Sequence, residues 1–293
     1  MKTSTLFPLF IGLIIIAAAG CSKPPAVKPG NVVNTVTKNP KTAVTVANYD
    51  FNDTLLTNNG WTKTFDDEFT GGLSNWFAYT GSEAAELEYF EPANVQIVDG
   101  VLQITAKKET ITDATTQKTF NYTSGSIVSN QTFSANATTP KVRMVARVKM
   151  ASGYGLASVF EAYGANWPTN GQINFFAVAG DDLKGYLTQY FYGTTPNQDL
   201  VTNAILYNPV DQDLSQAWHV FVTEWTQNSL NYYLDGQLVE TKTTGGYIPA
   251  LYTKPENISL LLPIGGLYYN NLVPANVQTG IMYVDYVKVF TSN

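Results

Sequence analysis

The sequence contains one cysteine, Cys21, and one histidine, His219, in 293 residues. A disulfide needs two cysteines, so a disulfide within the chain is excluded. Zinc sites and Ser-His-Asp triads use cysteine or histidine side chains, so the sequence argues against both kinds of site. Basic residues are also outnumbered, because 17 lysines and arginines face 23 aspartates and glutamates, for a formal net charge of -6. Nucleic acids and anionic lipid headgroups bind basic surfaces, so this balance argues against both as partners.

Long apolar runs are missing except near the N-terminus, where LFIGLIIIAAAG follows Lys2. A positive charge, an apolar run and small residues predict a secretory signal peptide over residues 1–20. The run ends in Ala18–Cys21, which resembles the bacterial lipobox and implies cleavage before Cys21 and its acylation; the alternative is a buried thiol beside an ordinary cleavage site. No other run approaches the ~18–20 residues that span a bilayer. We expect a lipoprotein of the bacterial outer membrane, displayed at the cell surface or facing the periplasm.

The stretch after Cys21 differs in composition from the rest of the chain. Residues 22–42 contain four prolines, four lysines and no acid. Segments rich in proline are extended spacers, so we expect a lipidated cysteine and flexible linker over residues 21–45. Residues 46–293 have uniform composition and no internal repeat, and their length is normal for one all-β domain. Aromatic residues form 13 % of the chain, with 18 tyrosines and 5 tryptophans, and aromatic side chains beyond core needs are typical of sugar-binding clefts.

Strand patterns are dense, and no long stretch repeats with helical period. In KVRMVARVKM, residues 141–150, apolar and basic residues alternate, which predicts a half-buried strand. Asp99-Gly100 and Asp235-Gly236 each separate two alternating runs, the pattern of a tight β-hairpin. Many strands separated by turns over this length predict an all-β sandwich or jelly roll.

Six stretches between about Trp61 and Phe290 carry a set of motifs in a fixed order. They are GWTKTFDDEFTGG, ELEYFEPANVQIVDGVLQITAKKE, YTSGSIVS, VARVKMASGYG, WHVFVTEWTQNSLNYYLDGQ and VDYVKVF. Together they resemble glycoside hydrolase family 16, especially its laminarinase-like β-1,3-glucanases. The resemblance implies a concanavalin-like β-jelly roll of two curved antiparallel sheets, with a glycan cleft across the concave face.

The stretch WPTNGQINFFA, residues 167–177, aligns without a gap with the family's catalytic block W-P-x-x-G-E-I-D-x-x-E. In the family the first Glu is the nucleophile, the Asp tunes it and the last Glu is the general acid/base; here Gln172, Asn174 and Ala177 stand at these positions. Side chains 172 and 174 share a face of a strand, and Ala177 reaches that face only through a β-bulge. Retaining hydrolysis needs two carboxyl groups roughly 5 to 5.5 Å apart, so the resemblance implies binding without catalysis.

Other cleft positions also depart from the family pattern. Glu161 stands where a cleft tryptophan is expected, and Phe191 where a histidine is expected. Tyr268 and Tyr269 replace a tryptophan loop. These changes imply a cleft that has been rebuilt, with a glycan preference of its own.

The resemblance and the aromatic residues of the predicted cleft imply eight candidate glycan-binding residues. They are Trp167, Gln172, Asn174, Glu161, Asn94, Tyr268, Tyr269 and Trp225. For the aromatic residues the alternative is packing in the core, for Glu161 a solvated charge at the rim, and for the amides an internal role in a core strand. The resemblance also implies a possible structural calcium on the convex side, at positions matching Asp285, Gly100 and Glu68, because calcium prefers oxygen ligands.

The expected function is non-catalytic binding of β-glucan, either laminarin-type β-1,3-glucan or mixed-linkage glucan, by a surface lipoprotein that serves polysaccharide capture and uptake. An outer-membrane glycan transporter is the expected partner, and no cofactor is required. The first rival is an active endo-β-glucanase that uses other acids, such as Glu161, Asp181 or Asp182. The second is a structural or adhesion protein whose cleft is closed by Tyr268 and Tyr269.

Overall fold

The computed structural model describes most of the predicted domain. The described residues are 37–38, 43–46, 49–83, 86–196, 201–243, 247–269 and 272–293. The predicted signal peptide, Cys21 and most of the predicted linker lie outside them. Within these ranges, no helix has the length and apolar character needed to cross a membrane.

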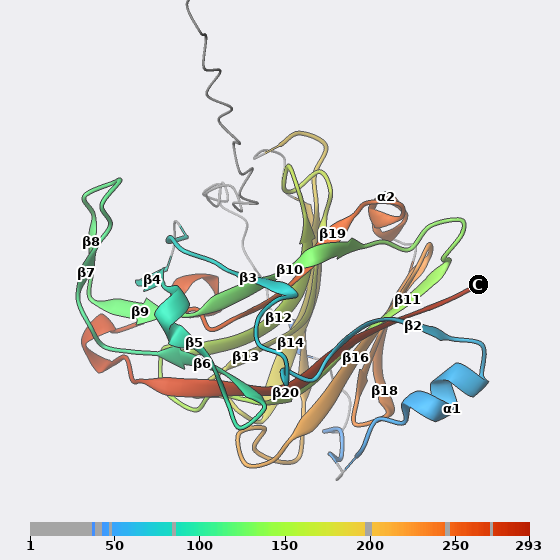
Figure 1. The fold of residues 1–293 in the computed structure, drawn as a ribbon, viewed down its shortest axis with the longest axis horizontal. Coiled ribbons are helices and arrows are strands. Elements are labelled where there is room, and N and C mark those ends of the chain that lie inside the picture. The colour runs from blue at the N-terminus through green and yellow to red at the C-terminus, as the bar shows by residue number, and fades with distance from the viewer. Residues whose placement is uncertain are drawn as a thin grey trace, which may run out of the picture.

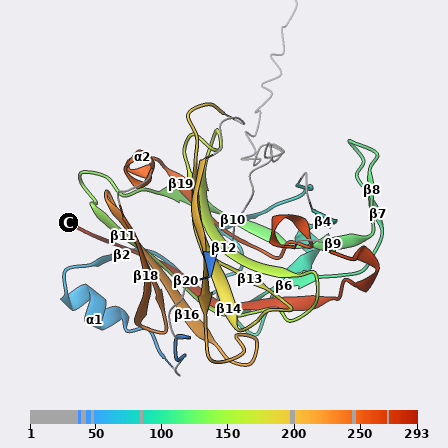
Figure 2. The same ribbon diagram turned by 180° about the vertical axis from the view of Figure 1, so that it is seen from behind.

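Two β-sheets pack face to face (Figures 1 and 2). The first sheet has the order β1 (Thr37–Lys38), β15 (Val201–Pro209), β14 (Gly185–Tyr192), β13 (Gln172–Ala179), β12 (Ala157–Gly164), β19 (Glu256–Leu261), β10 (Ser126–Phe133) and β3 (Trp76–Ala78). The second has the order β18 (Gln237–Thr243), β17 (Ser229–Leu234), β16 (His219–Thr226), β11 (Lys141–Lys149), β20 (Gly280–Ser292), β6 (Val101–Ala106) and β5 (Val95–Val98), and β2 (Thr62–Asp67) also pairs with β20. Apart from the parallel pair β1–β15, the strand pairs described in these sheets are antiparallel, which confirms the predicted β-sandwich of the jelly-roll type.

Smaller elements join and cover the sheets. They are the parallel pair β4 (Glu88–Phe90) and β9 (Tyr122–Ser124), the hairpin β7 (Ile111–Thr112) and β8 (Thr119–Phe120), the helices α1 (Asp53–Asn58) and α2 (Ile248–Leu251), and the 3-10 turns η1 (Pro92–Asn94), η2 (Gly266–Tyr268) and η3 (Pro274–Asn276).

The predicted strand and hairpins are present in the second sheet. Along β11, Val142, Met144 and Val148 are buried in the core, whereas the intervening basic residues are partly exposed. Asp99 and Gly100 have φ angles of 52° and 77°, and the Asp235-Gly236 pair repeats this geometry. Positive φ at both central residues suits the tight turn that matches the twist of paired strands.

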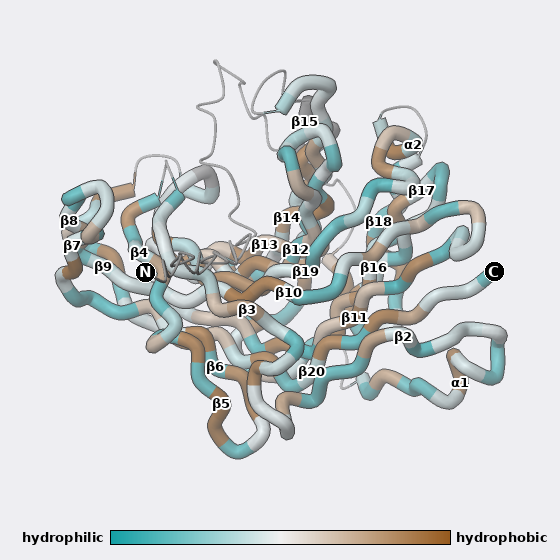
Figure 3. Tube along the Cα trace, turned by 45° about the horizontal axis from the view of Figure 1, so that its top comes forward, coloured by the Kyte–Doolittle hydropathy of each residue, from teal (hydrophilic) through white to brown (hydrophobic). Residues whose placement is uncertain are grey.

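The core between the sheets is rich in aromatic rings. Phe176 of the first sheet lies 4.5 Å from Phe221 of the second, measured between ring centroids, and Tyr186 meets Phe221 edge-on at 5.3 Å. Figure 3 shows hydrophobic segments on strands of both sheets. Trp225 on β16 belongs to this core and is 1 % exposed. The prediction that Trp225 lines a glycan cleft is therefore wrong for this structure, because its side chain points between the sheets.

The buried position of Trp225 leads to a stability prediction. Its indole Nε1–H is buried without a hydrogen-bond partner in the part of the chain described. Trp225→Phe removes that unpaired donor but keeps an aromatic ring, whereas Trp225→Ala leaves a cavity that costs about 3–5 kcal/mol. We expect urea unfolding to give Trp225→Phe a free energy of unfolding much closer to that of the natural protein than Trp225→Ala has. Equal losses in the two variants would contradict a core role for the ring.

Candidate functional site

The candidate site lies on the face of the first sheet that points away from the second sheet, here called the open face. Along β12 and β13, Phe160, Ala162 and Ile173 point into the core between the sheets. Side chains alternate along a strand, so Glu161 and Gln172 point to the open face. The sequence candidates of these two strands therefore meet on one surface.

A β-bulge in β13 returns Ala177 to the open face. Glu161 pairs with Asn174, but the preceding Phe160 pairs with Phe176, so Phe175 is the extra residue of β13. Phe175 and Phe176 both join the core cluster. Beyond the bulge Ala177 pairs with Val159 and lies on the same side as Asn174, as the sequence analysis required.

Four candidate residues form one hydrogen-bonded group. The Trp167 indole N–H donates to Gln172 Oε1 at 2.7 Å. Gln172 Nε2 donates to Glu161 Oε2 at 2.6 Å and to Asn174 Oδ1 at 2.9 Å. Asn174 Nδ2 donates to the same Glu161 oxygen at 3.2 Å. The neutral amides of β13 thus bind a carboxyl group supplied by the neighbouring strand β12.

This carboxylate is nearly withdrawn from solvent. Glu161 is 1 % exposed and Asn174 is fully buried. Hydrogen bonds from two amides favour the ionised form of a carboxyl group and offset part of the cost of burying it. Glu256 on β19 lies near enough to feel this charge, because burial first and the Glu161 charge second raise its pKa well above the ordinary value. Glu256 therefore favours its protonated form more than an exposed carboxyl group does, whereas two amides donate hydrogen bonds to Glu161.

The surroundings of Ala177 are apolar. Ala177 is 2 % exposed and belongs to a separate cluster with the buried side chains of Phe90, Ala157, Val159 and Leu261. Tyr79, Leu187 and Tyr268 pack against this cluster. Ala177 is therefore part of an apolar patch, and Tyr268 contributes to that patch.

Tyr269 has a structural role. Its hydroxyl donates to the Leu156 carbonyl oxygen at 2.6 Å and accepts from the Gly180 N–H at 3.1 Å. Burial is the main cause that raises the pKa of this hydroxyl far above its ordinary value. Tyr269 therefore fixes its loop to the ends of β12 and β13.

A pocket opens on the open face beside Glu161. About 220 Å³ of empty space lies in it, and this volume includes open solvent, so the pocket is a shallow hollow. Its lining residues are Tyr79, Glu83, Ser126, Glu161, Tyr163, Ser259 and Leu261.

Sequence reasoning identified only Glu161 among these lining residues. Strand alternation could have indicated Tyr163, which lies two residues after Glu161. Ser259 could not be found in this way, because it comes from β19, a strand far away in sequence that pairs directly with β12.

Asn94 lies apart from the group around Glu161. It is 1 % exposed in η1, and its Nδ2 donates to Thr123 Oγ1 at 2.8 Å and to the Ser124 carbonyl at 3.2 Å. It is not among the residues that line the pocket. In this structure its amide holds β9 in place.

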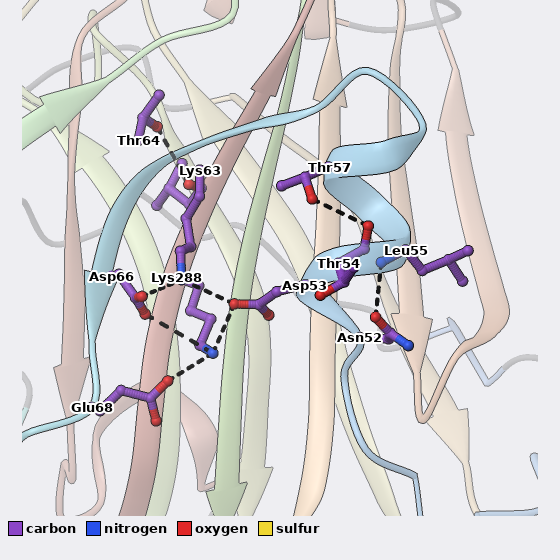
Figure 4. A network of polar contacts seen from close by, with 11 residues as sticks. Asn52, Asp53, Thr54, Leu55, Thr57, Lys63, Thr64, Asp66, Glu68 and Lys288 are labelled. Carbon is purple, nitrogen blue, oxygen red and sulfur yellow. Dashed lines mark hydrogen bonds and ion pairs between the residues drawn. The ribbon is translucent and has the colours of Figure 1, made fainter.

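The residues at the predicted calcium positions lie in ion pairs or in a turn. The Asp285 carboxylate accepts from Arg147 at 2.6 Å, and Glu68 forms an ion pair with Lys288 at 2.7 Å, as Figure 4 shows for the latter. Gly100 lies in the β5–β6 turn, where its backbone carbonyl is the atom that a calcium ion would use. Among the described residues, no group of three or more His, Cys, Asp or Glu side chains could hold a metal ion. A calcium site built on main-chain carbonyls stays a prediction.

The loop that carries Tyr268 is held by a buried glutamate. Glu88 is fully buried, and its Oε2 accepts from the Ile264 N–H at 2.8 Å. Burial raises the pKa of Glu88 to about 7, opposed by hydrogen bonds from the Glu86 side chain and the Ile264 backbone. The folded protein therefore binds this proton more tightly than the unfolded chain does.

The raised pKa of Glu88 predicts a pH dependence of stability. A raised carboxyl pKa contributes stability below pH ~4.5, and this contribution is lost as the pH rises through about 7. The Glu88 contribution should lower the free energy of unfolding of the natural protein between pH 5 and 8. In Glu88→Gln we expect this fall to be smaller by roughly 1–3 kcal/mol, measured by urea unfolding. Glu91→Gln, which removes a partly exposed carboxyl nearby, should leave the pH profile unchanged. Identical profiles for the natural protein and Glu88→Gln would refute this assignment.

The apolar patch predicts the outcome of restoring an acid. Ala177→Glu places a carboxyl among Phe90, Val159 and Leu261, and burying it there should cost about 2–4 kcal/mol of unfolding free energy. Ala177→Val, which adds only apolar volume, is the control for steric crowding. Thermal unfolding should show a larger loss for the glutamate than for the valine. A fully stable Ala177→Glu variant would show that the patch can accept a carboxyl.

Comparisons with known proteins agree with the fold. The family described as "Glycosyl hydrolases family 16" matches residues 87–261. The endo-β-1,3-glucanase of Pyrococcus furiosus has a similar structure, with a TM-score of 0.68 at 27 % identity over 80 % of this chain and 95 % of that chain. The laminarinase catalytic domain of Thermotoga maritima MSB8 shares the fold, with a TM-score of 0.67 at 22 % identity over 80 % of this chain and 99 % of that chain.

Two curated relatives extend the comparison. The clotting factor G alpha subunit of Tachypleus tridentatus is 26 % identical over 78 % of this chain and 34 % of its own length. The endo-1,3-1,4-beta-glycanase ExoK of Rhizobium meliloti is 26 % identical over 64 % of each. The chain thus spans less than two thirds of either relative. The match over residues 87–261, together with the shared sandwich fold, shows that this chain belongs to glycosyl hydrolase family 16.

Proposed function

We propose that this protein binds β-glucan on the open face without hydrolysing it. The observation that carries the proposal is the group formed by Glu161, Gln172 and Asn174. Two amides bind one carboxylate there, where the resemblance to the family places a nucleophile and its tuning acid. Such a group offers donors and acceptors to sugar hydroxyls but supplies no carboxyl group from β13 itself.

The surroundings of this group also support binding. Hydrolysis by the retaining route needs a second carboxyl group that gives up a proton, about 5 to 5.5 Å from the nucleophile. The family's position for that group is Ala177, inside the apolar patch. Tyr79 and Tyr163 line the neighbouring pocket and provide aromatic rings beside polar groups. Similar solved structures include an endo-β-1,3-glucanase and a laminarinase, which supports a β-glucan as the ligand.

The N-terminal sequence adds a cellular location to this proposal. With Cys21 at a lipobox-like position, the protein is a lipoprotein of the bacterial outer membrane that captures polysaccharide at the cell surface. Several acyl chains anchor a domain firmly to a bilayer. Capture at this place serves a neighbouring glycan transporter, which is the partner we propose.

The rival function is hydrolysis by displaced acids. Glu161 and Glu83 line the same pocket, so the open face does hold two carboxyl groups. Asp181 and Asp182 are exposed in the turn between β13 and β14, and neither lines the pocket. Hydrolysis would therefore depend on Glu161.

Isothermal titration and product analysis test the proposal together. We expect saturable binding of laminarin or mixed-linkage glucan, no binding of dextran, and no new reducing ends after long incubation. Gln172→Ala removes one donor to Glu161 and one acceptor for Trp167, so affinity should fall at least fivefold. Gln103→Ala, on the second sheet, is the matched control and should bind normally.

Two outcomes would overturn the proposal. The first is an absence of binding to every β-glucan. The second is turnover of laminarin that disappears in Glu161→Gln but persists in Asp182→Asn, which would establish the rival function.

A further inference from the structure

The two sheets differ in the charges that their strands carry. The strands β3, β10, β12, β13, β14, β15 and β19 of the first sheet contain no lysine or arginine, and Lys38 in the edge strand β1 is the one basic residue among the described strands of this sheet. The strands of the second sheet, with β2, carry seven: Lys63, Lys141, Arg143, Arg147, Lys149, Lys242 and Lys288. The charged residues on the central strands of the first sheet are therefore acids.

Glu161 is the acid that lies at the pocket. It pairs with Asn174 on one side and with Ser259 of β19 on the other, so it sits in the middle of the first sheet. Its Oε2 is held by the two neutral amides described above, and its side chain lines the pocket together with Glu83. Neutral amides orient a carboxylate but do not cancel its charge.

We propose that Glu161 selects ligands by charge, so that the open face accepts neutral glycans and rejects those with carboxylate or sulfate groups. This inference rests on the proposed function, because it concerns the ligand of the same site. A carboxylate is only an acceptor, and the hydroxyl groups of a neutral sugar donate to it. A uronate or sulfated sugar replaces some of these donors with negative charge beside Glu161.

Repulsion of this kind acts on specificity more than on affinity for the preferred ligand. Like charges brought together in a binding site disfavour the wrong partner, and a repulsive element is a common source of discrimination. The low exposure of Glu161 strengthens the effect, because a charge near the protein interior is screened less than one in water. The absence of basic residues from the central strands of this sheet leaves no cation on them to bind an anionic sugar.

The test compares three forms of one glycan: laminarin, carboxymethyl laminarin and hydroxyethyl laminarin, the last two at the same degree of substitution. Hydroxyethyl groups add similar bulk without charge, so the ratio of the two Kd values isolates the effect of charge. For the natural protein in 50 mM salt we expect the carboxymethyl form to bind at least tenfold more weakly than the hydroxyethyl form. In 500 mM salt the ratio should shrink, because salt screens the repulsion.

Two variants assign the effect to Glu161. Glu161→Gln keeps the size of the side chain and should reduce the ratio to within about threefold. Asp99→Asn is the matched control, because it removes one negative charge from an exposed turn of the second sheet and should keep the full ratio.

The outcomes separate the inference from the proposed function. Equal binding of the two derivatives by the natural protein, or full discrimination in Glu161→Gln, would overturn the inference while β-glucan binding stands. Failure of unmodified laminarin and mixed-linkage glucan to bind would overturn the proposed function itself. The salt dependence of the natural protein supplies a result even if Glu161→Gln does not fold.

Discussion

The open face depends on the compensation of one buried charge. Glu161 is 1 % exposed, and an isolated ionised carboxylate at such a depth is strongly unfavourable unless it is hydrogen-bonded. Gln172 and Asn174 provide those bonds from the adjacent strand, and Trp167 fixes the amide of Gln172 by donating to its oxygen. Each side chain therefore fixes the next. β12 thus supplies the acidic side chain at the centre of this face, and β13 supplies the amides that bind it.

The bulge at Phe175 divides the face into two parts. On one side of it, Asn174 and Gln172 face Glu161 in a polar group; on the other, Ala177 joins an apolar patch with Phe90 and Leu261. The extra residue lets Phe175 and Phe176 both enter the core, so the core gains an aromatic ring at the point where the open face changes character. The bulge thus separates a polar surface from an apolar one on the same face.

Sequence reasoning reached the fold because the relevant information is local. Alternation along β11 and the two Asp-Gly turns each depend on a few neighbouring residues, and the structure contains all three. Alternation could not have placed Trp225, because β16 is apolar on both faces. Val220 and Val222 belong to a second hydrophobic cluster, whereas Phe221 and Trp225 belong to the main core. Alternation identifies two faces of such a strand but does not say which one is interior.

The candidate site was only partly predictable, for a different physical reason. Glu161, Gln172 and Trp167 were each found from motif positions, but their mutual contacts depend on the register of β12 against β13 across a bulge. Ser259 and Ser126 reach the pocket through pairings between strands that are distant in sequence. A single sequence shows which residues a strand offers but not which strand lies beside it. Contacts across the sheet therefore had to come from the structure.

Charge balance links the site to the stability of the domain. Glu256 and Glu88 are both fully buried, and burial raises the pKa of each. A carboxyl group that keeps its proton adds no charge to repel its neighbour, and the Glu161 charge is the second cause of the raised pKa of Glu256. The first sheet can therefore hold Glu256 near Glu161, whose carboxyl group the amides of Gln172 and Asn174 bind. A further carboxyl group placed on β13 beside Glu161 would meet the same conflict between burial and charge repulsion.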